Sequence, residues 1–443
     1  MNKKEIILKN LDFIRQKRAE GATLREICKM LEDEYGIAPS PQYISRFLNR
    51  ESRMSRRKDR LVIYKNHQKI AQIFKTADGY VVVFEKGVEP FCEPGFYEKL
   101  PPFLENLLPE GANRELLIQK HRLDPNDEFG LLALCTDTFG GWSAVEPTRT
   151  KAPPFPRPSG YDGTILRYIA LEKDVREAIL DLYFSNSSEI LNRLSQLSGA
   201  QPKFACSFDG NRLYLPTPQK ERSNAFVKVV NKKFRNINLI ENLFLHFGRI
   251  ELGLPAAFTY VYFEKDLISA PSFAKEYSDH LIAQRLDRMD GEVKDVVELV
   301  MLMGRRSEEK YDLSIEEMFE FLDSRLVRED LSRLAKYVYY SYLVGNGDFH
   351  AKNVAFFKNP LRLAPMYDVV NTKIYGFDED IGMPFEGSRK IDEVRLVAFL
   401  RRWEPGIAAL KGVVKRRMRS YIDRTPLDGE VREKLLKSLG LEG

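Results

Sequence analysis

The sequence predicts an α+β fold preceded by a small all-α segment. Residues 61–85 form short runs rich in β-branched and aromatic side chains, as strands do, and residues 1–50 space apolar side chains as helices do. Beyond Tyr277 the chain is expected to be mostly helical. At 443 residues, with 43% apolar and 30% charged residues, the composition is that of a globular protein of two or three domains.

The sequence carries no sign of a membrane span or a secretory leader. No apolar stretch approaches the ~20 residues needed to cross a bilayer, and the first residues lack the apolar core of a signal peptide. No Cys-x-x-Cys pair exists among the four scattered cysteines, which are Cys28, Cys92, Cys135 and Cys206. Neither a zinc site nor a disulfide framework is therefore indicated, and we expect a cytoplasmic protein.

Residues 1–60 hold all of the basic excess. They contain 15 Lys or Arg and 9 Asp or Glu, a net charge of +6, whereas the remaining residues have a net charge of −1. We expect helices at about 4–18, at 24–34 behind a capping box, and after Pro41. The last two helices and their turn are typical of a helix-turn-helix, which reads DNA from the start of its second helix.

The candidate DNA-binding residues lie on that last helix and in the basic linker after it: Gln42, Tyr43, Ser45, Arg46, Arg50 and Arg53. Arginines in the linker could neutralise phosphates. A small helical packing module with a solvated charged linker is the alternative, and charge placement together with the motif favours DNA.

Turn residues divide the middle of the chain. Asp78-Gly79 and Asp209-Gly210-Asn211 predict hairpins, and Gly140 is expected to begin one more strand. The proline-rich run 151–160 excludes a helix interior and a central strand, so it reads as a linker. The predicted organisation is a DNA-binding segment at 1–60, an N-terminal subdomain at 61–155, a phosphate-loop lobe at 156–276 and a helical lobe at 277–443.

The most informative motif runs from Gly345 to Asn353. Asp348 and Asn353 are five positions apart, and Asp368 follows a short apolar run, as do the catalytic and metal-binding residues of protein kinases. Phosphoryl transfer needs a carboxylate to orient and deprotonate the attacking hydroxyl, and hard oxygen ligands for Mg²⁺. A polar turn would also be rich in Gly, Asn and Asp, but the upstream features favour a kinase.

Two upstream residues suit phosphate binding. Lys228 is embedded in a short apolar strand, and because an unpaired buried ammonium is costly, it either points to solvent or meets an anion. Glu241 is expected to open a helix, where it either pairs with Lys228 or is an acid favoured near a helix N-terminus; the position favours the second explanation. The Gly/Ala turn before Lys203 lets backbone N–H groups approach phosphate oxygens.

Taken together, these segments resemble the HipA-like serine/threonine kinases, the toxins of bacterial toxin–antitoxin modules. The resemblance covers nearly everything from Leu61 onwards. It rests on Leu107–Arg114, Ser198–Lys203, Phe226–Lys228, Gly347–Asn353 and Leu363–Asp368. It implies a bilobal, protein-kinase-like fold with a mixed α/β N-lobe and a mostly helical C-lobe. It also implies ATP and Mg²⁺ as cofactors, a protein substrate such as an aminoacyl-tRNA synthetase, and an antitoxin partner.

The resemblance implies roles for individual residues. Asp348 would be the catalytic base, and Asn353 and Asp368 would hold Mg²⁺. His350 is expected to orient the catalytic loop by hydrogen bonding, while Lys352 either stabilises developing phosphoryl charge or faces solvent. The nucleotide-binding candidates are Ser198, Gly199, Ala200, Gln201, Lys203, Lys228 and Glu276.

The chain departs from the family in two places. Many members autophosphorylate a phosphate-loop serine at the position where this chain has Gln196, which leaves Ser198 and Ser195 as candidates. The fused helix-turn-helix-like segment would supply in cis the DNA binding that a separate antitoxin usually provides. A small-molecule kinase of similar fold and a DNA-binding regulator that senses nucleotide remain alternatives.

Overall fold

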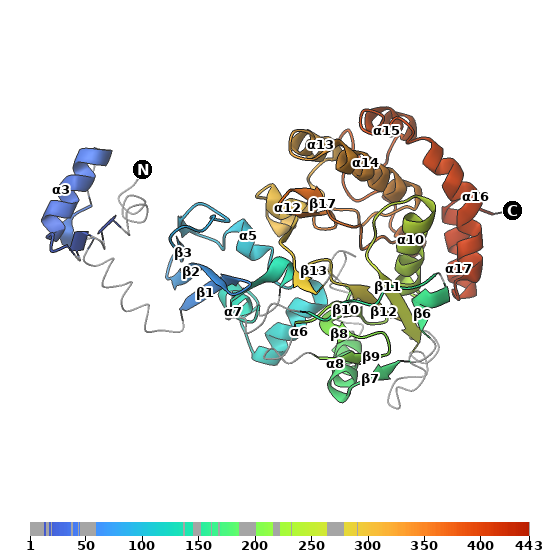
Figure 1. Ribbon diagram of the computed structural model, residues 1–443, viewed down its shortest axis with the longest axis horizontal. Coiled ribbons are helices and arrows are strands. Elements are labelled where there is room, and N and C mark those ends of the chain that lie inside the picture. Colours follow the sequence, from blue (N-terminus) through green and yellow to red (C-terminus); the bar gives the residue numbers. More distant parts are fainter. Residues whose placement is uncertain are drawn as a thin grey trace. The chain divides into compact units, whose positions relative to one another are not determined.

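The computed structural model divides the chain into two compact units (Figure 1). The first comprises residues 1–108, 126–138 and 142–147, and the second comprises residues 109–125, 139–141 and 148–443. No helix in the described part of the chain is both long and apolar enough to cross a membrane. The structure describes residues 13–14, 17–18, 20–36, 39–42, 44, 59–135, 138–144, 152–160, 162–166, 169–185, 201–215, 222–231, 233–263, 279–289 and 291–442.

The N-terminal segment contains helix α3 (Leu24–Tyr35), as the sequence predicts. The Thr23 hydroxyl accepts from the Glu26 backbone N–H, and the Glu26 carboxylate accepts from the Thr23 N–H at 2.6 Å. This capping box satisfies two donors that the first helical turn would leave without partners. The expected helices on either side fall largely outside the described residues. The buried apolar cluster of this segment comprises Ile14, Ile27, Cys28, Leu31 and Ile44.

The rest of the first unit is an antiparallel five-stranded sheet in the order β4-β3-β2-β1-β5. Its strands are β1 (Arg60–Lys65), β2 (Gln68–Thr76), β3 (Gly79–Phe84), β4 (Gly95–Tyr97) and β5 (Trp142–Ser143), and its helices are α5 (Pro102–Glu105) and α7 (Glu128–Ala133). The hairpin expected at Gly79 is confirmed, and a Cβ there would lie 2.2 Å from the Tyr97 carbonyl oxygen. The strand expected from Gly140 starts only at Trp142, because Gly140 and Gly141 have positive φ and form the 3₁₀ turn η1 (Phe139–Gly141).

The second unit is built on a seven-stranded sheet in the order β6-β11-β12-β10-β8-β9-β7. The strands are β6 (Ile165–Leu166), β7 (Ala170–Leu171), β8 (Lys203–Phe208), β9 (Arg212–Tyr214), β10 (Ala225–Lys228), β11 (Thr259–Phe263) and β12 (Asp279–Gln284). Strand β12 lies just beyond Tyr277, at the start of the region that the sequence predicts to be mostly helical. All of its residues are buried, so it lacks the polar alternation that marks a half-exposed strand.

The helices of this lobe are α6 (Gly111–His121), α8 (Lys173–Ser185) and α10 (Ile237–Glu251), with the 3₁₀ turn η2 (Asp162–Thr164) before β6. Helix α10 contacts β11 and β12, and in Figure 1 it stands beside them. It begins four residues earlier than expected, so Glu241 lies in its second turn and not at its N-terminus.

The remainder of the second unit is mainly helical. Its helices are α12 (Leu299–Leu302), η3 (Ser307–Tyr311), α13 (Ile315–Asp323), α14 (Arg328–Leu343), η4 (Lys373–Tyr375), α15 (Glu393–Leu400), α16 (Ala409–Arg424) and α17 (Gly429–Ser438). Its short strands are β13 (Arg288–Met289), β14 (Glu292–Val293), β15 (Val296–Glu298), β16 (Ala355–Phe357) and β17 (Arg362–Leu363). The predicted helix before the catalytic loop is confirmed as α14, which packs against α13, α15 and α16 (Figure 1).

Candidate active site

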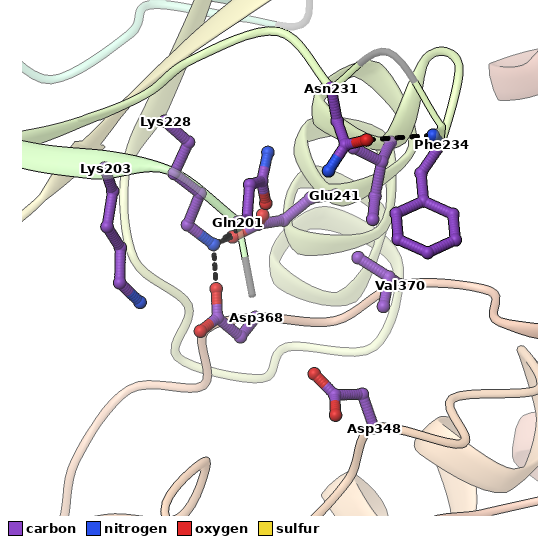
Figure 2. Close-up of a pocket in the computed structure, with 10 residues that line it drawn as sticks. Gln201, Lys203, Lys228, Asn231, Phe234, Glu241, Asp348, Asp368 and Val370 are labelled. Atoms are coloured by element: carbon purple, nitrogen blue, oxygen red, sulfur yellow. Dashed lines mark hydrogen bonds and ion pairs between the residues drawn. The ribbon is translucent and has the colours of Figure 1, made fainter. Parts of the chain in front are cut away.

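Residues from distant parts of the chain line one pocket of the second unit (Figure 2). Strands β8 and β10, helix α10, the catalytic loop after α14 and the segment after β17 all contribute to it. The lining residues are Gln201, Lys203, Lys228, Asn231, Phe234, Ile237, Glu241, Asp348, Asp368 and Val370. The pocket therefore joins the predicted phosphate-binding residues to the predicted catalytic loop.

Lys228 lies buried at the centre of this arrangement. Its Nζ is 2.8 and 2.7 Å from the two carboxylate oxygens of Glu241, and it also contacts Asp368 Oδ1 (Figure 2). Burial lowers the pKa of Lys228, and the Glu241 carboxylate opposes that shift. Lys228 thus meets anions and not solvent, and the preferred explanation of Glu241 as a mere N-terminal acid was wrong.

Lys203 brings a second cation to the same pocket. It lies directly across from Lys228 on the neighbouring strand, so the two side chains project from the same face of the sheet. Gln201 donates to Asn238 Oδ1, and Asn238 in turn donates to the Asp279 carbonyl at 2.6 Å. These bonds connect the beginning of β8 to α10 and β12.

The pocket also has an apolar side that sequence reasoning missed. Phe234, Ile237 and Val370 form one hydrophobic cluster there. Their sequence pattern does not distinguish them from ordinary core residues. Lysines beside an apolar wall suit a ligand with both phosphates and a flat ring.

Asp348 is buried on the catalytic loop, where the Tyr311 hydroxyl donates to its Oδ1 at 2.6 Å. Burial raises the pKa of Asp348 to about 6, although the Tyr311 hydrogen bond acts in the opposite direction. The carboxylate is therefore mainly ionised at neutral pH and titrates just below it.

His350 packs behind this carboxylate. Its Nδ1 accepts from the Lys352 backbone N–H at 3.2 Å, and its Nε2 lies 3.8 Å from Asp348 Oδ1. Burial holds the pKa of His350 well below its usual range, so the ring is neutral. This contact is of the loop-orienting kind that the sequence predicts.

Asn353 and Asp368 carry oxygens of the types that bind a magnesium ion. Asn353 Nδ2 donates to the Asp348 carbonyl at 2.9 Å, which leaves its Oδ1 accepting no hydrogen bond from any residue that the structure describes. Asp368 has φ 53°, and its Oδ1 contacts Lys228. This contact leaves its second carboxylate oxygen for a metal ion. Mg²⁺ prefers carboxylate and amide oxygens, so this donor set fits the ion.

Lys352 belongs to a separate, half-buried cluster around Glu110. Its Nζ lies 2.6 Å from one Glu110 carboxylate oxygen, while Lys310 Nζ lies 2.8 Å from the other and Ser307 also donates. Burial raises the pKa of Glu110, but Lys352 and Lys310 outweigh burial and hold that pKa well below its usual range. The ammonium of Lys352 is thus engaged by a carboxylate, an arrangement that neither sequence alternative included.

Glu298 completes this cluster, with Oε2 3.8 Å from Lys352 Nζ. Burial raises its pKa to about 7. Sequence reasoning missed both acids as site residues. Glu110 nevertheless lies inside Leu107–Arg114, one of the segments that carried the resemblance.

Several predicted site residues lie outside the described residues. Among the nucleotide-binding and autophosphorylation candidates these are Ser195, Ser198, Gly199, Ala200 and Glu276. Among the DNA-binding candidates they are Tyr43, Ser45, Arg46, Arg50 and Arg53, while Gln42 is described and exposed.

Solved structures that are similar to this chain include two from bacteria. HipA of Shewanella oneidensis, solved in a complex with HipB and operator DNA, has 18% identity and a TM-score of 0.58, and the match covers 86% of this chain and 96% of that one. The Helicobacter pylori kinase CtkA has 16% identity and a TM-score of 0.36, with 53% and 88% of the chains covered. The likeness to the Shewanella HipA confirms the predicted α+β, bilobal fold class.

Sequence comparisons identify the family. A Sinorhizobium fredii protein designated a candidate kinase, Y4dM, is 25% identical over 296 residues, which are 63% of this chain; this chain spans 64% of that protein. The HipA N-terminal domain model matches residues 61–143, and the HipA-like C-terminal domain model matches residues 195–427. Because the second match alone exceeds half of the chain, this protein belongs to the HipA family of kinase-like proteins.

Proposed function

We propose that this protein is an ATP- and Mg²⁺-dependent serine/threonine protein kinase. One observation carries the proposal: the Asp348 carboxylate lines the same pocket as the buried Lys228–Glu241 pair and Asp368. A base, a phosphate-binding cation and a metal ligand are the parts that phosphoryl transfer requires.

Each residue would act on a stated atom. Lys228 and Lys203 bind phosphate oxygens, and the Glu241 carboxylate holds Lys228 in position. Asp348 uses the oxygen that Tyr311 does not occupy to accept the proton of the attacking hydroxyl. Asn353 Oδ1 and the remaining oxygen of Asp368 would hold Mg²⁺, which would supply charge neutralisation on the phosphates.

The test is incubation with γ-labelled ATP in Mg²⁺ or in excess chelator. We expect label on protein in Mg²⁺ and a loss of about 100-fold or more in chelator and in Asp368→Asn. Glu433→Gln, which changes an exposed carboxylate on α17, is the matched control and should label like wild type. Chelator-resistant labelling, or full labelling of Asp368→Asn, would contradict the proposal.

We include autophosphorylation of the phosphate loop in the proposal. It is supported by the family and by the two serines that the sequence places there. Peptide mapping of the label should find it on Ser198 or Ser195, and the Ser195→Ala/Ser198→Ala double variant should lose it. Label confined to other peptides would contradict this part.

A translation component such as an aminoacyl-tRNA synthetase is the proposed acceptor, and an antitoxin is a proposed partner. Both follow from the family alone. Labelling of a panel of purified synthetases, with Asp348→Asn as the negative control, tests the first. Co-purification of a small DNA-binding protein with the full chain tests the second, and a chain that purifies alone from its own cells would count against it.

DNA binding through residues 1–60 is proposed as a second activity. The basic excess of this segment and the capped, apolar-packed helix α3 support it. In the full chain, replacing Arg46, Arg50 and Arg53 with glutamine should weaken DNA retention and reduce the salt slope by about 3, because each phosphate contact releases roughly one counterion. Unchanged retention and slope would remove this proposal.

A further inference from the structure

Asp348 lines a second pocket besides the one that holds Lys228. The other side chains of this second pocket include Tyr311, Thr372, Phe377, Glu379 and Arg389. Our inference rests on the proposed kinase function: if the phosphate donor occupies the first pocket, an acceptor hydroxyl can reach the same carboxylate from the second. The second pocket is therefore the candidate acceptor site.

Close backbone packing builds this pocket. A Cβ on Gly382 would lie 2.7 Å from the carbonyl oxygens of both Gly347 and Phe349, so only glycine allows this approach. Gly347 is equally confined, because a Cβ there would lie 2.5 Å from Thr372 Oγ1, which already accepts from the Gly347 N–H at 3.0 Å. The segment after Asp368 is thus pressed against the catalytic loop.

Glu379 is a carboxylate of the wall that has no short contact with a cation in the described part of the chain, although its charge acts on Lys390. In the acidic run Asp378-Glu379-Asp380, Asp378 pairs with Lys390 at 2.5 Å and Asp380 pairs with Lys373 at 2.5 Å. Glu379 lies between them, lines the pocket, and forms no ion pair or hydrogen bond within the described part of the chain. Its charge is therefore available to an incoming group.

Arg389 is the cation of the same pocket, and it is already engaged. Its guanidinium donates to the Tyr311 carbonyl at 3.0 Å and lies 5.6 Å from the centre of the Tyr311 ring. The charge of Arg389 is therefore directed at the pocket wall. Because Asp348 and Glu379 carry two negative charges against this one positive charge, the pocket has an excess of negative charge.

We propose that this pocket takes the acceptor segment of a protein substrate and that Glu379 selects a lysine or arginine next to the serine or threonine. A charge-assisted hydrogen bond from that cation to Glu379 would favour basic acceptors by about tenfold in kcat/KM over neutral ones. Acidic acceptors would be disfavoured by repulsion from the same carboxylate.

Three short serine peptides test this proposal with the full chain and γ-labelled ATP. They are identical except for the residues flanking the serine, which are lysine, glutamine or glutamate. We expect wild type to label the lysine peptide best and the glutamate peptide least. Glu379→Gln should flatten the ranking and Glu379→Lys should reverse it, whereas Asp378→Asn, the neighbouring acid paired with Lys390, should keep it.

Four outcomes would overturn the proposal. They are equal labelling of the three peptides, no labelling of any peptide while ATP is turned over, an unchanged ranking in Glu379→Lys, and a wild-type preference for the glutamate peptide that Arg389→Gln abolishes. The last result would assign the pocket to acidic acceptors. If neither peptide nor protein takes up label and ATP is not turned over, the kinase function itself fails, which is distinguishable from these four.

Discussion

Two lysine–glutamate pairs, one buried and one half-buried, differ in what surrounds them. Lys228 and Glu241 line the pocket and Lys228 also contacts Asp368, whereas Lys352 of the catalytic loop contacts Glu110, which also binds Lys310 and Ser307. The chemistry of the two pairs is the same, and their surroundings differ. Lys228 of the first pair lines the pocket, while Lys352 of the second pair is held by Glu110 and so connects the loop to a segment 242 positions away.

The largest effect is expected from the pair that faces the pocket. Lys228→Met should reduce phosphate transfer by about 10³-fold, because it removes the cation that would stabilise the phosphates and leaves Glu241 buried without its partner. Label transfer measured beside Lys437→Met, an exposed lysine on α17, checks this. Wild-type transfer by Lys228→Met would mean that the pair is only structural.

Breaking the second pair should lower kcat and stability together. Glu110→Gln leaves Lys310 and Lys352 without their carboxylate, so we expect a loss of about 3 kcal/mol in the free energy of unfolding. We also expect kcat to fall by about 10- to 100-fold with little change in the KM for ATP, since the nucleotide pocket is intact. Urea titration and steady-state kinetics measure the two effects, and a raised KM with unchanged kcat would contradict the distinction between the pairs.

Asp348 lines the pocket of the first pair and lies on the same loop as Lys352 of the second pair. Its pKa of about 6 gives a stability prediction. The pKa of Asp348 in the folded state exceeds the usual 3.8, so ionisation of this carboxyl opposes folding. The stability that the neutral acid contributes is therefore lost as pH rises through about 6. Asp348→Asn should therefore stabilise the unliganded protein by about 1 to 3 kcal/mol at pH 7 to 8 and have no effect near pH 4. Thermal unfolding across this range measures it, and an equal shift at every pH would refute the assignment.

The smallest effect concerns Tyr311, which follows Lys310 of the second cluster and donates to Asp348. Tyr311→Phe removes this hydrogen bond and keeps the ring, so kcat should fall by roughly fivefold. Since the Tyr311 hydrogen bond lowers the pKa of Asp348, the acid limb of the pH–rate profile should move to higher pH in the variant. An acid limb that stays in place would show that Tyr311 does not act through the base.

The features that could be predicted from the sequence are formed by residues close to one another in the chain. The spacing of Asp348, Asn353 and Asp368 and the capping box of α3 are readable because their residues are close in the chain. The bond between Glu110 and Lys352 joins residues 242 positions apart, and no local pattern marks it.

Two elements of the second unit, the start of α10 and strand β12, were not predicted correctly. The start of α10 was misplaced although Asn236, a residue type favoured at N-caps, precedes the helix; in the structure Asn236 has φ 56°, and its side chain accepts from the Asp428 N–H and caps no N–H of α10. Strand β12 was missed because it is buried on both faces.

The most direct test of the account measures ATP binding and phosphate transfer on the same preparations of wild type and Asp348→Asn. The account predicts that the variant binds ATP with Mg²⁺ within a few-fold of the wild-type affinity and transfers label at least about 100-fold more slowly, because only the base is changed. Transfer by Asp348→Asn at the wild-type rate would contradict the central claim that Asp348 is the base shared by the donor and acceptor pockets.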